Sequence, residues 1–356
     1  MFRYLPLLPI HPVTRRPHLR VGWSPLYKTE RLGRHLGLNH LYVKDDGQNP
    51  TASLKDRASV IAVIKAIEEQ APTVACSSTG NAASSLAGCA AALGLRAYIF
   101  VPKRAPQAKI AQLLIFGAKV ICVDGSYEDT YQLSSQAIAR FGWYNRNAAI
   151  NPYLVEGKKT VVFEMAEQLN WEVPDWVIVS VGDGCTIAGV WKGFRDFYLT
   201  GLIDRLPRLV GVQAKGASPL ADAFQENRPW RPTAENTLAD SIAVGVPRNP
   251  DKALRAVQES GGMMVAVSDD EILEAMRDLG MLGGIFGEPA GVAGLAGLKN
   301  LVHQGVIGAE DKVVALITGN GLKDVKNAVA AVGNPLVVMP DLDRLVAILE
   351  SKSGSK

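Results

Sequence analysis

Short β-rich runs alternate with helical runs along most of this chain of 356 residues. This alternation is typical of a parallel sheet wrapped by helices, because two parallel strands are usually joined by a crossover helix. It predicts an α/β fold with mostly parallel strands. The predicted strands are 41–44, 73–76, 97–101, 119–123, 176–181, 209–213 and 313–318. The predicted helices are 57–69, 82–94, 108–116 and 187–198.

The order of these elements predicts two α/β domains. A smaller domain is expected near residues 50–158, inserted into a larger one formed by residues 1–49 and 159–345. Residues 346–356 end in a short polar stretch and are expected to form a disordered tail. The basic, proline-rich start carries no acid before Glu30, and we expect an arm on the protein surface rather than a targeting signal.

The composition argues against several classes of protein. Hydrophobic residues make up 47% of the chain and charged residues 21%, which is typical of a soluble globular protein. The net charge of +3 is too small to indicate nucleic-acid binding, and no run of apolar residues is long enough for a membrane span. The five isolated histidines and four cysteines without a C-x-x-C pair argue against a metal site or a histidine-based triad. We therefore expect a protein of the reducing cytoplasm.

Lys55 lies in the run 49–57, which reads Asn-Pro-Thr-Ala-Ser-Leu-Lys-Asp-Arg. A lysine that leaves a turn at the start of a helix can be shielded enough to lose its proton and still swing aside. These are the requirements for a lysine that binds pyridoxal 5'-phosphate (PLP) as a Schiff base. The alternative is an ordinary helix start with Ser53 as its N-cap, and the run alone leaves both interpretations open.

The polar turn 77–81, Ser-Ser-Thr-Gly-Asn, joins a predicted strand to a predicted helix. Backbone N–H groups at a helix N-terminus attract negative charge. We therefore expect Ser78, Thr79 and Gly80 to bind a substrate carboxylate, and Asn81 to donate to the ring hydroxyl of the cofactor. The alternative is a well-capped turn that binds no ligand.

A second turn of this kind, 182–186, reads Gly-Asp-Gly-Cys-Thr. Glycines allow the backbone to approach a phosphate closely, and the final threonine adds a hydroxyl. A dinucleotide-binding fingerprint is excluded because Ile187 and Ala188 supply no third glycine, and Pro152 excludes a Walker A motif around Gly157. The predicted residues of the cofactor phosphate site are Gly182, Asp183, Gly184, Cys185 and Thr186.

Thr318 ends the last predicted strand, in the run Thr-Gly-Asn-Gly-Leu-Lys-Asp of residues 318–324. A threonine hydroxyl beside the pyridine nitrogen of PLP shares a hydrogen bond but carries no charge. The ring is then less protonated than beside a carboxylate, which favours elimination and replacement at Cβ or Cγ of an amino acid.

Together these four segments resemble the tryptophan synthase β-like (fold type II) PLP enzymes, and within them the threonine synthase branch. The similarity covers almost the whole chain. Further matching runs are 3–4 with 7–9, 23–26, 151–152 with 156–157 and 160, 173–176, 284–286 and 288–290.

The resemblance implies a homodimer whose subunits each have two open α/β domains with the active site in the cleft between them. It implies that Lys55 forms the Schiff base and moves protons, that Asn81 contacts the ring hydroxyl and that Thr318 faces the pyridine nitrogen. The implied enzyme is a lyase for a small amino-acid substrate, in which O-phosphohomoserine and water give threonine and phosphate.

The chain departs from the branch where the substrate phosphate is usually bound. Ala148, Ala149 and Leu154 stand in place of Asn, Ser and Arg, and Asp183 replaces an Asn of the phosphate loop. Losing a bidentate arginine and adding a like charge should each cost on the order of 1 kcal/mol or more of phosphate binding. The basic residues that could compensate, if they point into the site, are Arg146, Lys158 and Lys159.

Two alternatives to threonine synthesis therefore stay open. One is PLP-dependent β-elimination or replacement on an unphosphorylated or differently activated amino acid, as in a Ser/Thr dehydratase. The other is a non-catalytic, regulatory PLP-binding protein, against which the joint presence of Lys55, Asn81 and Thr318 argues.

Overall fold

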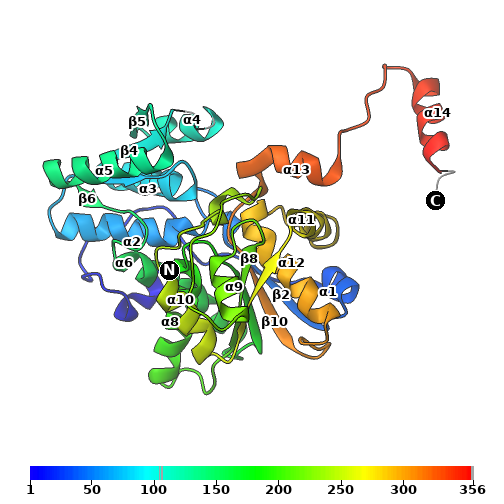
Figure 1. Ribbon diagram of the computed structural model, residues 1–356, viewed down its shortest axis with the longest axis horizontal. Helices are drawn as coiled ribbons and strands as arrows, with labels where there is room; N and C mark the ends of the chain where they lie inside the picture. The colour runs from blue at the N-terminus through cyan, green and yellow to red at the C-terminus, as the bar shows by residue number, and fades with distance from the viewer. Residues whose placement is uncertain (104, 106, 354–356) are drawn as a thin grey trace.

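Two sheets form the body of the computed structural model, which describes residues 1–103, 105 and 107–353 (Figure 1). The larger sheet has the strand order β1-β2-β10-β7-β8-β9 and the smaller has the order β5-β4-β3-β6. The strand pairs are parallel except for the antiparallel pair of β1 and β2, which confirms the predicted α/β fold with mostly parallel sheets. The larger sheet consists of β1 Leu26–Lys28, β2 His40–Asp45, β7 Trp176–Ser180, β8 Arg208–Ala214, β9 Met263–Val267 and β10 Lys312–Ile317. The smaller sheet consists of β3 Thr73–Ser77, β4 Arg96–Pro102, β5 Lys119–Val123 and β6 Tyr144–Asn145.

Helices cover both faces of the larger sheet, as its apolar strands require. Alternate strand residues point to opposite faces, so Ile178 belongs to one core while Val177 and Val179 belong to the other. The first core lies under α1 Glu30–Leu36, α11 Asp269–Gly283, α12 Pro289–His303 and α13 Val325–Val332. The second lies under α7 Thr160–Gln168, α8 Cys185–Leu199, α9 Pro219–Gln225 and α10 Pro250–Glu259.

The smaller sheet shares its core with α2, α3 and α4, where Val60, Leu86 and Ile99 are fully buried. Its strands all lie inside the segment 50–158 that was predicted as the smaller domain, while the domain boundaries themselves stay a prediction. The helices of this part are α2 Lys55–Glu68, α3 Asn81–Leu93, α4 Gln107–Ile115, α5 Tyr127–Phe141 and α6 Tyr153–Lys158.

A buried charge network fixes α2 to the larger sheet. The Arg57 guanidinium donates to Asp46 Oδ2 at 2.6 Å, beyond β2, and to Glu164 Oε1 at 2.6 Å, on α7. Lys44 of β2 donates to the other oxygen of Glu164 at 2.9 Å. These four side chains are completely buried, so the helix that begins with Lys55 is held in place by paired charges.

The two ends of the chain differ in their packing. The short 3-10 helix η1 (Phe2–Leu7) buries Tyr4, which agrees with an arm lying against the body. The segment after α13 leads to α14 (Leu342–Ser353), which projects from the body (Figure 1). Most of the tail predicted to be disordered therefore lies in a helix, because Leu342, Leu345, Val346 and Leu349 have helical spacing. The last three residues lie outside the described part of the chain.

No helix within the described residues is both long enough and apolar enough to cross a membrane.

Candidate active site

Lys55 is the first residue of α2 and lies beside the end of β10. The backbone N–H of Leu54 donates to Thr318 O at 2.8 Å, and Ser53 forms an isolated antiparallel bridge with Gly319. The carboxyl end of a parallel strand is where α/β folds place their ligands. These contacts bring together the turn before Lys55 and the run starting at Thr318, which are far apart in sequence.

Asp56 holds the turn that precedes Lys55. Its carboxylate accepts hydrogen bonds from the backbone N–H and the hydroxyl of Thr51, and Ala52 takes a left-handed conformation with φ of 66°. Burial raises the pKa of Asp56 to about 6, against the opposing effect of these hydrogen bonds. The alternative of an ordinary Ser53 cap is incomplete, because the Asp56 carboxylate, rather than Ser53 alone, holds this turn.

The amine of Lys55 is prepared to lose its proton near neutral pH. Desolvation, followed by repulsion from Lys158 and Arg146, lowers its pKa from 10.5 to about 8, while Glu288 and Cys185 act in the opposite direction. A neutral amine can act as a nucleophile and as a base, which a protonated one cannot.

The loop after β7 forms a cradle at the start of α8. Gly184 has a φ of +87°, and a Cβ there would lie 2.7 Å from both Ala253 Cβ and Asn249 O. The carboxylate of Asp183 accepts from the backbone N–H of Arg248 at 3.3 Å, so this oxygen is engaged within the loop. Helix α8 begins at Cys185, and its first N–H groups provide the positive end of a helix dipole. Close backbone approach and a helix N-terminus suit a phosphate group.

The turn before α3 is only partly available to a ligand. The N–H of Ser78 donates to Phe100 O at 3.2 Å, and the N–H of Gly80 faces Ser78 Oγ at 3.2 Å. Thr79, Gly80 and Asn81 line a cleft, and the side chain of Asn81 donates to Glu288 Oε1 at 2.6 Å. Thr79 and Gly80 thus lie where a carboxylate could bind, whereas the backbone of Ser78 is already engaged.

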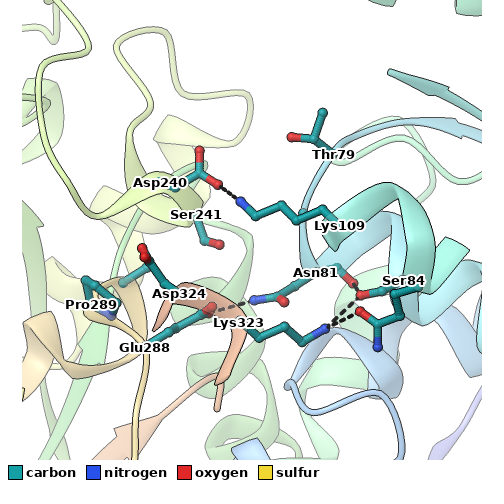
Figure 2. Close-up of a pocket in the computed structure, with 13 residues that line it drawn as sticks. Thr79, Asn81, Ser84, Lys109, Asp240, Ser241, Glu288, Pro289, Lys323 and Asp324 are labelled. Carbon is teal, nitrogen blue, oxygen red and sulfur yellow. Dashed lines mark hydrogen bonds and ion pairs between the residues drawn. The ribbon is translucent and has the colours of Figure 1, made fainter. Parts of the chain in front are cut away.

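Side chains from both parts of the molecule meet across this cleft (Figure 2). Lys323 donates to Ser84 Oγ and Gln112 Oε1, both at 3.1 Å, and Lys109 pairs with Asp240. The residues labelled in Figure 2 are Thr79, Asn81, Ser84, Lys109, Asp240, Ser241, Glu288, Pro289, Lys323 and Asp324.

Glu288 is a site residue that the sequence analysis did not assign, although its run 288–290 matches the family pattern. Burial raises its pKa to about 7, against the hydrogen bond from Asn81 and the charges of Lys323 and Lys55. A Cβ on Gly319 would lie 2.2 Å from Glu288 Oε1, so this glycine leaves the space that the carboxyl group occupies. Glu288 therefore connects Asn81 to the segment that follows Thr318.

Two residues considered for the substrate phosphate site, Leu154 and Lys159, contact other parts of the protein. Leu154 is buried against Ala58 and Ala62 of α2, where it forms part of a small apolar core. Lys159 is paired with Glu156 at 2.6 Å and Asp196 at 2.7 Å and is not available to a ligand.

The arrangement fits PLP on three structural grounds. Lys55 has a lowered pKa, the 182–184 loop leaves a cradle that a Cβ would fill, and Asn81 is buried with its amide directed into the site. The individual contacts of Lys55, Asn81, Thr318 and residues 182–186 with the cofactor stay predictions.

Comparison with known proteins also indicates a PLP enzyme. The family described as "Pyridoxal-phosphate dependent enzyme" matches residues 18–319. The chain is 41% identical to a threonine synthase of Methanocaldococcus jannaschii, over 98% of this chain and 87% of that protein. It is 39% identical to a threonine synthase of Synechocystis, over 96% and 87% respectively.

Among solved structures, the chain is similar to a threonine deaminase from Solanum lycopersicum, with a TM-score of 0.74, 23% identity and coverage of 87% and 88% of the two chains. It is also similar to maize serine racemase, with a TM-score of 0.73, 21% identity and coverage of 94% of both chains. At these identities the likeness establishes a shared fold alone.

Proposed function

Because this chain belongs to the pyridoxal-phosphate dependent enzymes, in the branch that holds the threonine synthases, we propose that it converts O-phosphohomoserine and water into threonine and phosphate. The chain is a PLP-dependent lyase. The observation that carries the proposed reaction is the similarity to threonine synthases over 98% of the chain. The fold alone is shared with deaminases and racemases and does not select among these reactions.

The residues of the site can be matched to the parts of PLP. Lys55 would bind its aldehyde carbon, Asn81 its ring hydroxyl and Thr318 its pyridine nitrogen. When bound, PLP supplies an electron sink that stabilises negative charge on the substrate carbon next to the amino group. The residues that would hold its phosphate are Gly182, Asp183, Gly184, Cys185 and Thr186.

Lys55 would also move the protons of the reaction. Its pKa of about 8 leaves a useful fraction of neutral amine near neutral pH, which can take a proton from Cα of the substrate and return one at a neighbouring carbon. Thr79 and Gly80, at the start of α3, would orient the substrate carboxylate. The position of Asn81 is maintained by its hydrogen bond to Glu288.

A second candidate is elimination on an unphosphorylated amino acid, as in a Ser/Thr dehydratase. It is favoured by Ala148 and Ala149, which offer no side-chain donors, and by Leu154, which packs against α2. The phosphate group of a phosphorylated substrate would then need hydrogen-bond donors from other residues of the site.

A substrate panel on the purified holoenzyme separates the two. Phosphate, ammonia and threonine release are followed separately with O-phosphohomoserine, serine and threonine. Phosphate together with threonine from O-phosphohomoserine supports the proposed reaction. Ammonia and a keto acid from serine or threonine, without turnover of O-phosphohomoserine, would establish the second candidate instead.

We further propose that the enzyme is a homodimer of the cytoplasm, by resemblance to its branch. Size-exclusion chromatography with light scattering tests the dimer directly.

A further inference from the structure

Two buried cations beside Lys55 have no carboxylate partner. Arg146 is 2% exposed; its Nε donates to Ser59 Oγ at 3.0 Å, while its Nη2 has no hydrogen-bond partner. Lys158 is 4% exposed, and its ammonium forms no hydrogen bond or ion pair with any residue of the described chain. Burying an unpaired charge is costly, so such groups usually exist to meet a ligand of opposite charge.

The other buried lysines and arginines of this region form ion pairs with buried or half-buried carboxylates. Arg57 is paired with Asp46 and Glu164, and Lys44 shares Glu164. Lys159, the chain neighbour of Lys158, is paired with Glu156 of α6 and with Asp196 of α8. Five lysines and arginines are buried within the described part of the chain, namely Lys44, Arg57, Arg146, Lys158 and Lys159, and of these only Arg146 and Lys158 form no ion pair.

Lys158 lies between α6 and α8, and Arg146 lies after β6 beside β3. Lys158 ends α6, which packs so closely on α8 that a Cβ at Gly189 would lie 3.0 Å from Lys158 Cβ. Arg146 follows β6, and its N–H donates to Ala75 O of β3 at 2.9 Å. The charges of both residues lower the pKa of the Lys55 amine. Burial lowers the pKa of Lys158 itself, while Cys185 at the start of α8 and Asp183 in the loop before it act in the opposite direction.

The cofactor phosphate has its own cradle in residues 182–186, so a further dianion is needed to match these two positive charges. We infer that Arg146 and Lys158 bind the phosphate group of the substrate, in place of the donors that are missing at positions 148, 149 and 154. This inference rests on the proposed function. Two cations facing a phosphate ester favour its binding and also favour its departure with the electron pair of the C–O bond.

Inorganic phosphate tests the site without turnover, because it is the proposed product and PLP already fills the cofactor site of the holoenzyme. Its binding is measured by calorimetry on the wild type, Arg146→Gln and Lys158→Gln. We expect each variant to bind phosphate about tenfold or more weakly, as for loss of a charge-assisted contact. Lys192→Gln is the matched control, since Lys192 lies 42% exposed on α8 and the charge change is the same. The control should bind phosphate as the wild type does.

Kinetics and PLP content provide independent readouts. The KM for O-phosphohomoserine should rise in both variants by a similar factor, while the PLP absorbance band and the KM for unphosphorylated serine stay the same. Unchanged phosphate binding in both variants would overturn the inference. Loss of PLP from both variants would also overturn it, since the two cations would then hold the cofactor.

Thermal unfolding of the wild-type holoenzyme with phosphate tests the inference even if a variant folds poorly. In buffer without sulfate, phosphate should raise the unfolding temperature of the wild-type holoenzyme more than chloride does at equal ionic strength. Lys158→Arg should retain this effect, because it keeps the positive charge. No such protection in the wild type would contradict the inference.

The outcomes also separate this inference from the proposed reaction. If O-phosphohomoserine is not turned over but phosphate binding depends on Arg146 and Lys158, the proposed reaction fails and the anion site remains. If it is turned over with a KM that neither substitution changes, the reaction stands and the assignment of the two cations fails.

Discussion

Replacing Arg57 by methionine should destabilise the protein strongly, because Arg57 is at the centre of the network that fixes α2. Its five N–H groups make six hydrogen-bond contacts with Asp46, Glu164, Thr160 and Ser24, since Nη2 contacts three acceptors. Methionine fills a similar volume but leaves the Asp46 and Glu164 carboxylates buried, with only Glu164 still paired to Lys44.

The size of the effect follows from the burial of the network. Removing one partner of a buried ion pair costs about 3–5 kcal/mol. An unfolding entropy of about 2.1 cal/mol/K per residue gives about 0.75 kcal/mol/K for a chain of 356 residues. The expected fall in unfolding temperature is therefore about 4–7 °C.

The pH dependence of stability gives a second signature. Burial would raise the pKa of Glu164, but Arg57 and Lys44 outweigh it and hold that pKa well below its ordinary value of 4.5. The stability gained from the ionised carboxylate is present above pH 4.5 and is lost as the pH falls toward the pKa of the folded state. Arg57→Met should reduce this loss on acidification.

Thermal unfolding of the holoenzyme at several pH values measures both effects. Arg195→Met is the matched control, since Arg195 pairs with Glu259 at 3.2 Å on the surface and such pairs contribute about 1 kcal/mol or less. If Arg57→Met lowers the unfolding temperature no more than Arg195→Met does, the buried charge network does not hold α2 in place. PLP content should fall in Arg57→Met, because Lys55 is only two residues away.

Four further changes test the site. Lys55→Ala should abolish the covalent link to PLP, and borohydride reduction with peptide mapping should place the pyridoxyl group of the wild type on Lys55; another labelled lysine contradicts the assignment. Thr318→Asp should favour a protonated pyridine ring and alter the PLP spectrum and the product distribution, and no change in either means that Thr318 does not touch the ring nitrogen. Gly184→Ala should weaken PLP binding to the apoprotein by about tenfold or more, since φ is +87° and the new Cβ would clash with Ala253; unchanged affinity in a PLP titration would show that the cradle tolerates a side chain. The pKa of Glu288 is raised from 4.5 to about 7, so the folded state holds the extra proton and stability should fall as the pH rises between these values; Glu288→Gln should flatten that slope in thermal unfolding, and an unchanged slope would assign it to another group.

Much of the fold could be predicted because its strands are short apolar runs between polar turns. Strand β5 has the predicted bounds, β7 differs from its prediction by one residue at one end, and β8 and β10 differ by one residue at each end. Strand β6 has two residues and the edge strand β9 is only half-buried, so neither carries a strong pattern. Helix α2 begins at Lys55, two residues before the predicted start at Arg57, and its N-cap residue Leu54 makes no side-chain hydrogen bond, so this boundary carries no capping signal in the sequence.

The site could be predicted where a local run carries the chemistry, and not where burial does. Lys55, Asn81 and Thr318 stand in recognisable runs, and the structure joins their segments through Glu288, Leu54 and Gly319. The isolation of Arg146 and Lys158 has no sequence signal, because a missing partner is visible only after folding. The partner of Arg57 on α7 is 107 residues away, beyond any local pattern.

The strand order of the larger sheet affects how the chain is synthesised. Strand β10 lies between β2 and β7, yet it is the last of the strands to leave the ribosome. The smaller sheet is complete once residue 145 is made. Strand β2 ends at residue 45, but its parallel neighbour β10 is not synthesised until residue 312. At about 5–20 residues per second this delay of 267 residues lasts about 13–53 s. The edge of β2 remains open during that time, and the edge of β7 remains open from residue 180 onward, so the nascent chain must be protected from aggregation until its final strand inserts at the centre of the sheet.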